Sequence, residues 1–382
     1  MNINLKILIQ NRRDHDIVNG GDKIQIEKTV NALKRKYPEI IIDFSCEFNF
    51  DLSKYDIVHL FNVTRVHETY QYFLNAKKQN KPVALTPIYH SITGLELYEN
   101  NGRRGLLGYV NKVFKSADNR ELIKNMLRLL VQNDLKQIYP VMAQKHLGYY
   151  EQQKYVLENS DIIFPIAYEE ILCARKELNI IKHLNCIVTP NGVLDDLSGN
   201  VILDSQQESD FDKFDFKKLC VCIGRIENRK NQVSLINALK DTEFGVIFVG
   251  SPNPKNKYYF SEFIKCIDNK KFFYLGSLDH QKVFQLLKRA EVSVLPSWFE
   301  VTSLVDFEAY FAKCKIVTTK YSYIKDYIKN NIFYCDPLDV SSIKMAVEKA
   351  FEAKTESFDS FSHLTWDNTA EKVYAGYQSL LT

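Results

Sequence analysis

Short apolar runs rich in β-branched residues recur along the chain, and polar stretches separate them. Between many of these runs the apolar residues fall at helical spacing, as they do in 24–36 and 232–239. Strands that alternate with helices predict parallel sheets covered by helices on both faces. The runs expected to be strands are Leu5–Ile9, Ile40–Phe44, Ile57–Leu60, Val83–Thr86, Ile162–Phe164, Cys186–Val188, Leu219–Ile223, Val246–Val249, Phe272–Leu275, Val292–Leu295 and Ile316–Thr319.

The alternation stops at a polar, acidic stretch, 195–218, and starts again after it. We predict that this stretch is a linker between two domains. The fold class is therefore α/β, with two Rossmann-like doubly wound domains of similar size, at 1–194 and 219–365. In such domains ligands bind at the carboxyl ends of the strands.

The segment from about 95 to 158 breaks the alternation and is predicted to be a helical insertion in the first domain. Lys124 and Arg128 lie on one helical face. One interpretation is a packed helix with a solvated basic side, and the other is a contact with a membrane surface or an anionic acceptor. The opposite face is apolar and consists of Leu122, Ile123, Met126, Leu127 and Leu130.

The wider stretch 101–136 is basic, with eight basic and three acidic residues, a local charge of 8 − 3 = +5. If it meets a membrane, that membrane is expected to be anionic. The cations expected to act together there are Arg103, Arg104, Lys112 and Lys115.

Composition changes this picture little. The chain has 382 residues, of which 45% are hydrophobic and 25% charged, and its net charge is only +3. No apolar run approaches the roughly 18 residues of a membrane span, and the apolar start is too short for a signal-peptide core. We therefore expect a cytoplasmic protein. Its eight cysteines form no CxxC pair, so we expect them to be reduced.

Two glutamates, Glu300 and Glu308, stand eight residues apart where a predicted buried strand leads into a predicted helix. Ser303-x-x-Asp306 between them fits a capping box. Helix N-termini favour phosphate, and carboxylates accept hydrogen bonds from hydroxyls. Such a site suits a ligand that is part phosphate and part polyol, such as a nucleotide sugar.

Other motifs follow predicted strands. Arg225, with Lys230 five residues on, could converge on a diphosphate or belong to a solvated basic loop. Gly20-Gly21 could admit a ligand close to the backbone or be a plain loop pair. His90 follows a strand, where it is either a cleft residue or a structural histidine. His59 lies within a strand and is expected to be buried and hydrogen-bonded.

These motifs, in this order, resemble the GT-B retaining glycosyltransferases of family 4, the "glycosyl transferases group 1". The resemblance covers nearly the whole chain, with two domains around an interdomain cleft. Tyr55–His59 resembles the family's YDIVH strand, and Pro190–Val193 its PNGV. Gly224-Arg225-Ile226 with Lys230, and Glu300 with Glu308, resemble the GR-[LI]-x-x-x-K and E-x7-E signatures. The segment 366–382 resembles the helix that crosses back to the first domain.

The resemblance implies roles for these residues. Arg225 and Lys230 would hold the diphosphate and stabilise it as it leaves, and Glu300 would contact the sugar. His90 would lie near the transferred sugar. Donor-binding residues would be Gly20, Gly21, Thr302, Ser303, Leu304 and Glu308. No metal or cofactor is implied, because the cations and a helix terminus neutralise the diphosphate.

The chain departs from the family pattern in three places. Ser303 stands where glycine is usual, and 312–317 lacks the usual Ala-x-Gly-x-Pro-Val. The glycine-rich turn that normally follows is replaced by 320–324. His90 lies about two residues later than the family's histidine.

The sequence therefore predicts a metal-independent retaining glycosyltransferase, a hexosyl- or related transferase. Its donor would be a UDP-sugar, with a GDP-sugar as the second choice. Its acceptor would be a glycan or a lipid-linked glycan. The product would belong to a surface polysaccharide such as O-antigen or capsule, to lipopolysaccharide or to a glycolipid. It would be cytoplasmic, at the inner face of the membrane if 101–136 binds there, and no nucleic-acid partner is expected. The alternatives are a non-catalytic nucleotide-binding partner in a polysaccharide synthase complex and a GT-B epimerase.

Overall fold

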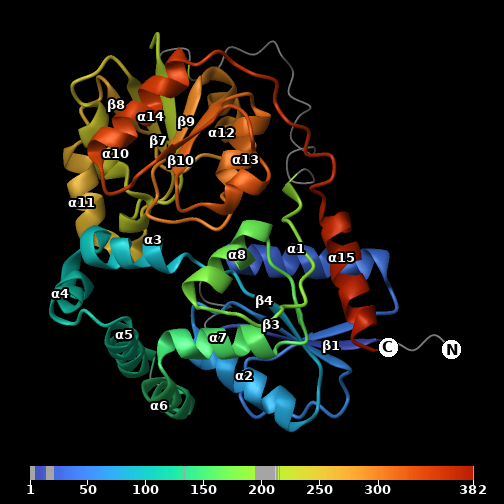
Figure 1. Ribbon diagram of the computed structural model, residues 1–382. Coiled ribbons are helices and arrows are strands. Elements are labelled where there is room, and N and C mark those ends of the chain that lie inside the picture. The colour runs from blue at the N-terminus through green and yellow to red at the C-terminus, as the bar shows by residue number, and fades with distance from the viewer. Residues whose placement is uncertain are drawn as a thin grey trace. The chain divides into compact units, whose positions relative to one another are not determined.

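The computed structural model describes residues 5–13, 21–132, 134–193, 211, 214 and 216–381. The chain forms two compact units, each built on its own parallel sheet (Figure 1). Unit 1 contains Met1–Ser91, Val113–Gly192 and Ser362–Thr382, and unit 2 contains Ile92–Lys112 and Val193–Phe361. The predicted insertion is thus shared: its first part packs with unit 2 and the rest with unit 1.

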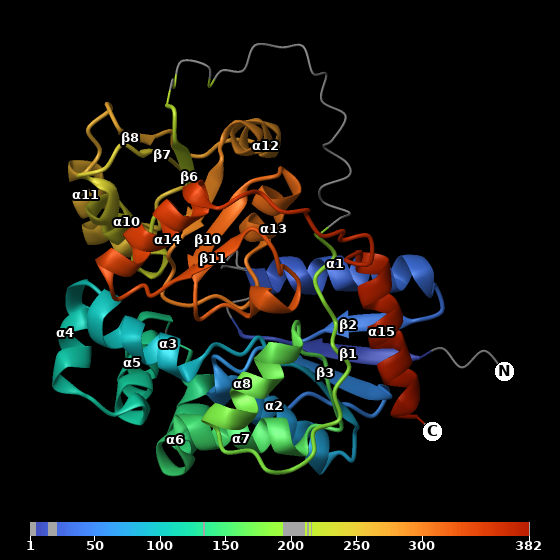
Figure 2. The ribbon, with the colours of Figure 1, turned by 45° about the horizontal axis from the view of Figure 1, so that its top comes forward.

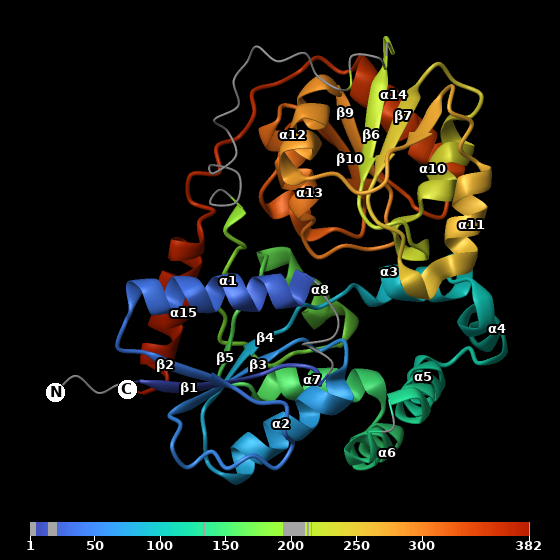
Figure 3. The ribbon, with the colours of Figure 1, turned by 180° about the vertical axis from the view of Figure 1, so that it is seen from behind.

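The sheet of unit 1 has five parallel strands in the order β2-β1-β3-β4-β5. Helix α1 covers one face, and α2 and α7 cover the other (Figures 1 and 3). Cys186–Val188, predicted as a further strand, makes only an isolated bridge to Ile163, because the neighbouring β5 is two residues long. The strands are β1 (Lys6–Gln10), β2 (Ile41–Phe44), β3 (Ile57–Phe61), β4 (Val83–Thr86) and β5 (Ile162–Ile163).

The last helix of the chain, α15 (Trp366–Ser379), packs against α1 (Gly21–Lys36) in unit 1. Its Tyr377 hydroxyl lies 2.7 Å from His59 Nδ1, and the other ring nitrogen of His59 lies 2.9 Å from Thr86 Oγ1. Burial lowers the pKa of His59 to about 3, so the ring is neutral. The prediction of a buried, hydrogen-bonded His59 is confirmed. The remaining helices of unit 1 are α2 (Val66–Lys78), α5 (Ala117–Gln132), α6 (Ile138–Leu147), α7 (Tyr149–Asn159) and α8 (Tyr168–Glu177).

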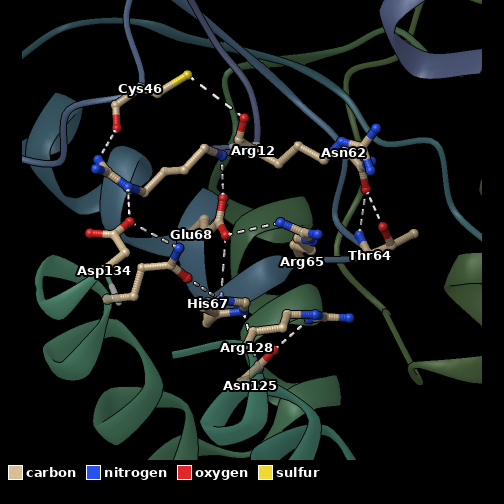
Figure 4. A network of polar contacts seen from close by, with 12 residues as sticks. Arg12, Cys46, Asn62, Thr64, Arg65, His67, Glu68, Asn125, Arg128 and Asp134 are labelled. Carbon is tan, nitrogen blue, oxygen red and sulfur yellow. Dashed lines mark hydrogen bonds and ion pairs between the residues drawn. The ribbon is translucent and has the colours of Figure 1, made fainter. Parts of the chain in front are cut away.

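Helix α5 does not expose the basic face that was predicted. Its Lys124 is only 6% exposed and pairs with Glu121, whereas Leu130 is 80% exposed. The reason is polar packing, since Asn125 donates to Gln144 on α6 at 2.7 Å. Arg128 in turn donates to Asn125 at 2.6 Å (Figure 4). The predicted solvated basic face is therefore wrong. Of the five residues of the predicted apolar face, Met126 and Leu130 are exposed and the other three are partly buried.

The sheet of unit 2 has six parallel strands in the order β11-β10-β9-β6-β7-β8. Helices α10, α11 and α14 lie on one side of it, and α12 and α13 on the other (Figures 2 and 3). The edge strand β11 was not predicted. The strands are β6 (Leu219–Ile223), β7 (Gly245–Val249), β8 (Phe272–Tyr274), β9 (Val292–Leu295), β10 (Lys315–Thr319) and β11 (Ile332–Cys335). The helices are α10 (Gln232–Leu239), α11 (Lys257–Lys265), α12 (His280–Arg289), α13 (Leu304–Phe311) and α14 (Val340–Glu352).

The strand order reverses between β6 and β9. From β6 the chain moves outward through β7 and β8, then returns to β9 on the other side of β6. The loops that leave β6 and β9 therefore diverge to opposite faces of the sheet, and the crevice between them is where doubly wound domains bind ligands. Residues 224–230 and 296–303 form these two loops.

The segment 92–112 packs on the loop after β9. It contains α3 (Ile92–Leu97), a π-helical turn (Tyr98–Gly102) and most of α4 (Gly105–Val113). Tyr98 forms an apolar cluster with Trp298 and Phe299. A Cβ on Gly102 would overlap the indole of Trp298, so glycine is required for this approach.

Candidate functional site

Three charged side chains meet at the crevice between β6 and β9. Lys230 Nζ donates to Glu300 Oε1 at 2.7 Å, and Arg229 Nη1 donates to the same oxygen at 2.9 Å. Arg229 also donates to the Phe299 carbonyl at 3.0 Å and lies over the Phe299 ring. One carboxylate oxygen is thus held by two cations that come from the other loop.

This arrangement keeps Glu300 ionised although it is only 9% exposed. Burial alone would raise the pKa of Glu300, but the charges of Arg229 and Lys230 outweigh it and hold that pKa well below its usual range. Burial would likewise lower the pKa of Arg229, but Glu300 and Glu227 raise it. An ionised carboxylate only accepts hydrogen bonds, so Glu300 is suited to ligand hydroxyls.

The cations are not quite those that the sequence singled out. Lys230 lies at the site as predicted, but the side chain of Arg225 is about half exposed and its nearest carboxylate, Glu227, is 3.6 Å away. Arg229, which the sequence analysis missed, shares Glu300 with Lys230. The sequence indicated only that Arg229 lies next to Lys230 on the loop after β6. Arg225, Arg229 and Lys230 all lie on this loop, and the sequence does not show which of them binds Glu300.

The start of α13 differs from the predicted capping box. Ser303 is the N-cap residue, but its side chain makes no capping hydrogen bond. Asp306, the other half of the predicted box, is fully buried and accepts instead from the hydroxyl of Thr318 at 3.0 Å. The capping box is therefore wrong, because β10 offers Asp306 a buried partner. Thr302, Ser303 and Leu304 surround a helix N-terminus without a side-chain cap, which is suited to an anion.

Asp306 is a second unusual carboxyl group at this site. Burial and the negative charge of Glu300 raise the pKa of Asp306 to about 7. Its Oδ1 has no hydrogen-bond partner among the described residues. Below about pH 7 Asp306 therefore still carries its proton, whereas Glu300 is already ionised.

Glu308, the second glutamate of the predicted pair, lies on α13. Its Oε1 is 3.3 Å from Nε2 of His280, the first residue of α12. The glutamate side chain is about one-fifth exposed, so it is open to a ligand. His280 was not identified from the sequence, because nothing in the spacing linked α12 to this pair.

The end of α13 explains one departure from the family pattern. Lys313 has φ = 73°, a left-handed conformation that glycine usually adopts. Its N–H donates to Tyr310 O at 3.0 Å, and that of Cys314 donates to Ala309 O at 2.9 Å, which together close a Schellman motif. Lysine therefore preserves the backbone that glycine would form.

The remaining predicted residues belong to unit 1. His90 is partly buried after the carboxyl end of β4, and Gly21 is the first residue of α1, whereas Gly20 lies outside the described residues. Ile88, two residues before His90, has φ = 48°, a strained conformation for a β-branched residue. Such strain is concentrated at functional sites, which favours a functional loop here.

A polar network in unit 1 follows the carboxyl ends of β1 and β3 (Figure 4). Glu68 accepts from the Arg13 backbone N–H at 2.7 Å and lies 3.5 Å from Arg65. Arg13 Nε also pairs with Asp134 at 2.6 Å. Burial, with smaller effects from Arg128 and Arg65, lowers the pKa of His67 to about 3, so His67 is neutral within the network. The sequence analysis identified none of this network, since its members are scattered along the chain.

Within the described residues, no group of three or more His, Cys, Asp or Glu side chains could hold a metal ion. No described helix has both the length and the apolar character needed to span a membrane. The eight cysteines are free thiols.

Comparison with a family model assigns a class to part of the chain. Residues 205–362 match the model of the family described as "Glycosyl transferases group 1". This range includes Arg225, Arg229, Lys230, Glu300 and Glu308. No curated protein matches the chain.

Solved structures share the fold over nearly the whole chain. Sucrose-phosphate synthase from Thermosynechococcus elongatus has a TM-score of 0.58 at 13% identity, over 98% of this chain and 94% of its own. The trehalose-6-phosphate synthase OtsA has a TM-score of 0.60 at 9% identity, over 98% and 99%. HepE from Anabaena, in complex with UDP, has a TM-score of 0.57 at 11% identity, over 98% and 97%. The predicted fold class, two Rossmann-like α/β domains of the GT-B type, is thereby confirmed.

Proposed function

We propose that the protein is a glycosyltransferase that moves a sugar from a nucleotide-diphosphate sugar to a hydroxyl group, with retention of anomeric configuration. The observation that carries this proposal is Glu300, held ionised by Arg229 and Lys230 beside the uncapped start of α13. Lys230, Arg225 and a helix N-terminus favour a diphosphate, and the carboxylate favours sugar hydroxyls. The family match over 205–362 supports the same class.

In this proposal Lys230 and Arg225 bind the diphosphate, which carries the growing negative charge as the sugar leaves. The bond from the anomeric carbon to the phosphate oxygen breaks, and the acceptor oxygen bonds to that carbon on the same face. The acceptor proton passes to the departing phosphate oxygen. Arg229 fixes Glu300 against the sugar, and Glu308 accepts hydrogen bonds from the ribose.

We favour a UDP-sugar as donor, with a GDP-sugar second. Related folds support this order, since HepE has been solved with UDP and with UDP-glucose. The donor is identified by thermal-shift measurements with UDP, GDP, ADP and their sugars, because a bound ligand raises the unfolding temperature. Turnover of the stabilising donor with a lipid-linked glycan then tests transfer. Binding without turnover of any donor would instead favour a non-catalytic partner, and release of free nucleotide without an acceptor would favour an epimerase.

The loss of the family's glycines around 313–324 would favour a non-catalytic partner if it disrupted the local backbone. Lys313 keeps the left-handed end of α13 that glycine would form, so the loss of glycine there does not disrupt the helix that follows Glu300. We therefore favour an active glycosyltransferase over a non-catalytic nucleotide-binding partner.

We propose that the acceptor is a lipid-linked glycan of a surface polysaccharide or glycolipid, and that unit 1 touches the membrane that carries it. The contact is made by the exposed apolar residues at the turn from α5 to α6, not by the basic residues of 101–136. Large apolar side chains in water favour burial in the membrane interface. We call this surface the α5–α6 apolar face, and define it by Leu130, Val131, Leu135 and Tyr139.

A further inference from the structure

A cavity of about 220 Å³ lies in unit 2, apart from the ion pairs of Glu300. The π-helical turn around Tyr98 and the start of α4 form one side of it. The loops after β6 and β7, through Asn228 and Lys255, form the other. At about 30 Å³ for each water, the volume equals roughly seven waters, which is the size of a small ligand.

The cavity is rich in positive charge. Arg103, Arg104 and Lys255 line it, and none of the described lining residues is acidic. Arg103 is fixed in place, since it pairs with Glu99 at 2.6 Å and lies over the Tyr98 ring. Arg104 lies 3.5 Å from Glu262, and both side chains are about half exposed, so this pair is weak and can exchange partners.

Two helices begin at the cavity. Gly105 is the first residue of α4, and Asn256 is the N-cap residue of α11. Neither helix has an acidic residue in its first turn. The side chain of Asn256 does not cap α11, because its Oδ1 accepts from the backbone N–H of Asn228 at 3.2 Å. Both helix dipoles therefore add to the positive potential of the three cations.

The cavity also holds an unused hydrogen-bonding group. Asn228 is 5% exposed, and its Oδ1 has no hydrogen-bond partner among the described residues. A buried amide oxygen without a partner costs free energy that a ligand hydroxyl would recover. Tyr98 and the exposed Tyr258 also line the cavity. The cavity thus combines anion-binding groups with a hydroxyl acceptor.

We propose that this cavity binds a phosphate ester of a small polyol, such as a sugar phosphate or the sugar-diphosphate end of a lipid-linked glycan. Arg104, Lys255 and the two helix N-termini bind the phosphate, and Asn228 accepts from a hydroxyl. The site is separate from the Glu300 site but adjacent to it. Tyr98 packs on Phe299 with ring centroids 5.9 Å apart, and Phe299 in turn lies under Arg229. A ligand here would be separated from the donor site by one aromatic layer.

The test is calorimetric titration of the full chain with hexose 6-phosphate, a short-chain lipid diphosphate, orthophosphate and unphosphorylated hexose. We expect at least one phosphate ester to bind and the neutral hexose not to bind. Tighter binding of hexose 6-phosphate would identify a free sugar phosphate as the ligand, and tighter binding of the lipid diphosphate would identify a lipid-linked glycan. Lys255→Ala and Arg104→Ala should each weaken binding about tenfold or more, as loss of a charge-assisted contact does.

Two control variants locate the effect. Lys265→Ala removes the same charge from the other end of α11 and should leave the affinity unchanged. Lys230→Ala disables the Glu300 site and should also leave it unchanged, so failure of the glycosyltransferase proposal would be seen separately. Absence of binding to every phosphate ester, equal weakening by Lys265→Ala, or loss in Lys230→Ala alone would overturn the proposal.

Discussion

Lys230 Nζ lies 2.7 Å from Glu300 Oε1, and this hydrogen bond joins the loops that leave β6 and β9. Because Arg229 binds the same oxygen, Glu300 is the counter-ion of two largely buried cations. Loss of its charge removes the carboxylate that the two cations share, and leaves Arg229 with Glu227 at 3.5 Å. Glu300 should therefore stabilise unit 2 as well as bind a ligand.

We expect Glu300→Gln to lower the free energy of unfolding of unit 2 by about 3 kcal/mol at pH 7, since it breaks a buried ion pair. The folded pKa of Glu300 is depressed, so its contribution is present above the usual pKa and declines as the pH falls below it. The difference between wild type and variant should thus be smaller at pH 4 than at pH 7.

Urea unfolding measures this difference with unit 2 isolated. The chain has two tryptophans, Trp298 in unit 2 and Trp366 in unit 1. In a Trp366→Phe background, fluorescence reports unit 2 alone. Glu243→Gln, which removes the exposed partner of Lys218, is the matched control and should change little. Equal effects of Glu300→Gln and Glu243→Gln would contradict the account.

Asp306 should act in the opposite direction. Its folded pKa is raised to about 7, so the contribution of Asp306 to stability is fully present below the usual pKa of an aspartate and is lost as the pH rises toward 7. Asp306→Asn cannot ionise and keeps an oxygen for Thr318. We expect the variant to gain about 2–3 kcal/mol on wild type between pH 5 and pH 8. The same unfolding measurement at both values tests this, and a pH-independent difference would refute it.

Part of the site followed from the sequence because it depends on local order. A buried strand, a loop and a helix place Glu300 and Glu308 near one strand end, and Lys230 follows the neighbouring strand. The identity of Arg229 as the partner of Glu300 depends on side-chain reach across two loops, which spacing does not encode. Asp306 was mistaken for a cap because its true partner, Thr318, lies on another strand.

The fold was predicted well where apolar runs are buried on both faces, as in β3 and β6. It was predicted poorly for α5, since periodicity shows that two faces differ but not which one packs inward. The polar partners of the buried Asn125 lie on α6 and α2, whereas Lys124 pairs with Glu121 on α5 itself. The edge strand β11 was overlooked because edge strands are only partly buried and carry a weaker pattern.

Lys313 offers a test of backbone strain at the end of α13, the helix that follows Glu300. Glycine in its left-handed conformation avoids a cost of about 1–2 kcal/mol, whereas the contact of Lys313 with the Phe358 ring is worth about 0.5–1 kcal/mol. Lys313→Ala loses only the contact, and Lys313→Gly loses the contact but relieves the strain. We expect the glycine variant to be about 1 kcal/mol more stable than the alanine variant in urea unfolding. A Lys313→Ala variant as stable as Lys313→Gly, or more stable, would show that the backbone at this position is not strained.

The α5–α6 apolar face predicts how unit 1 meets a membrane. Leu130 and Val131 are 80% and 85% exposed, and burying each side chain in lipid is worth about 1.5–3 kcal/mol. Leu130→Ser with Val131→Ser should therefore lower the fraction bound to vesicles at least tenfold, by co-sedimentation with neutral and with anionic lipid.

The matched control for this face is Ile181→Ser, which removes an exposed apolar side chain elsewhere in unit 1. It should leave the bound fraction unchanged. Unchanged binding of the double variant would show that unit 1 does not use this face. If only the Arg103→Ala and Arg104→Ala variants lost vesicle binding, the membrane contact would be made by the basic stretch 101–136 instead.

The proposal that Lys230 and Glu300 form a nucleotide-sugar site is tested most directly by the transfer rate of Lys230→Ala. With the donor that stabilises the wild type, we expect kcat to fall about 10²–10³-fold, because a leaving-group cation acts mainly in the transition state. Lys265→Ala should keep the wild-type rate, and the unfolding temperature should show that both variants are folded. A folded Lys230→Ala protein that transfers sugar at the wild-type rate would contradict the account.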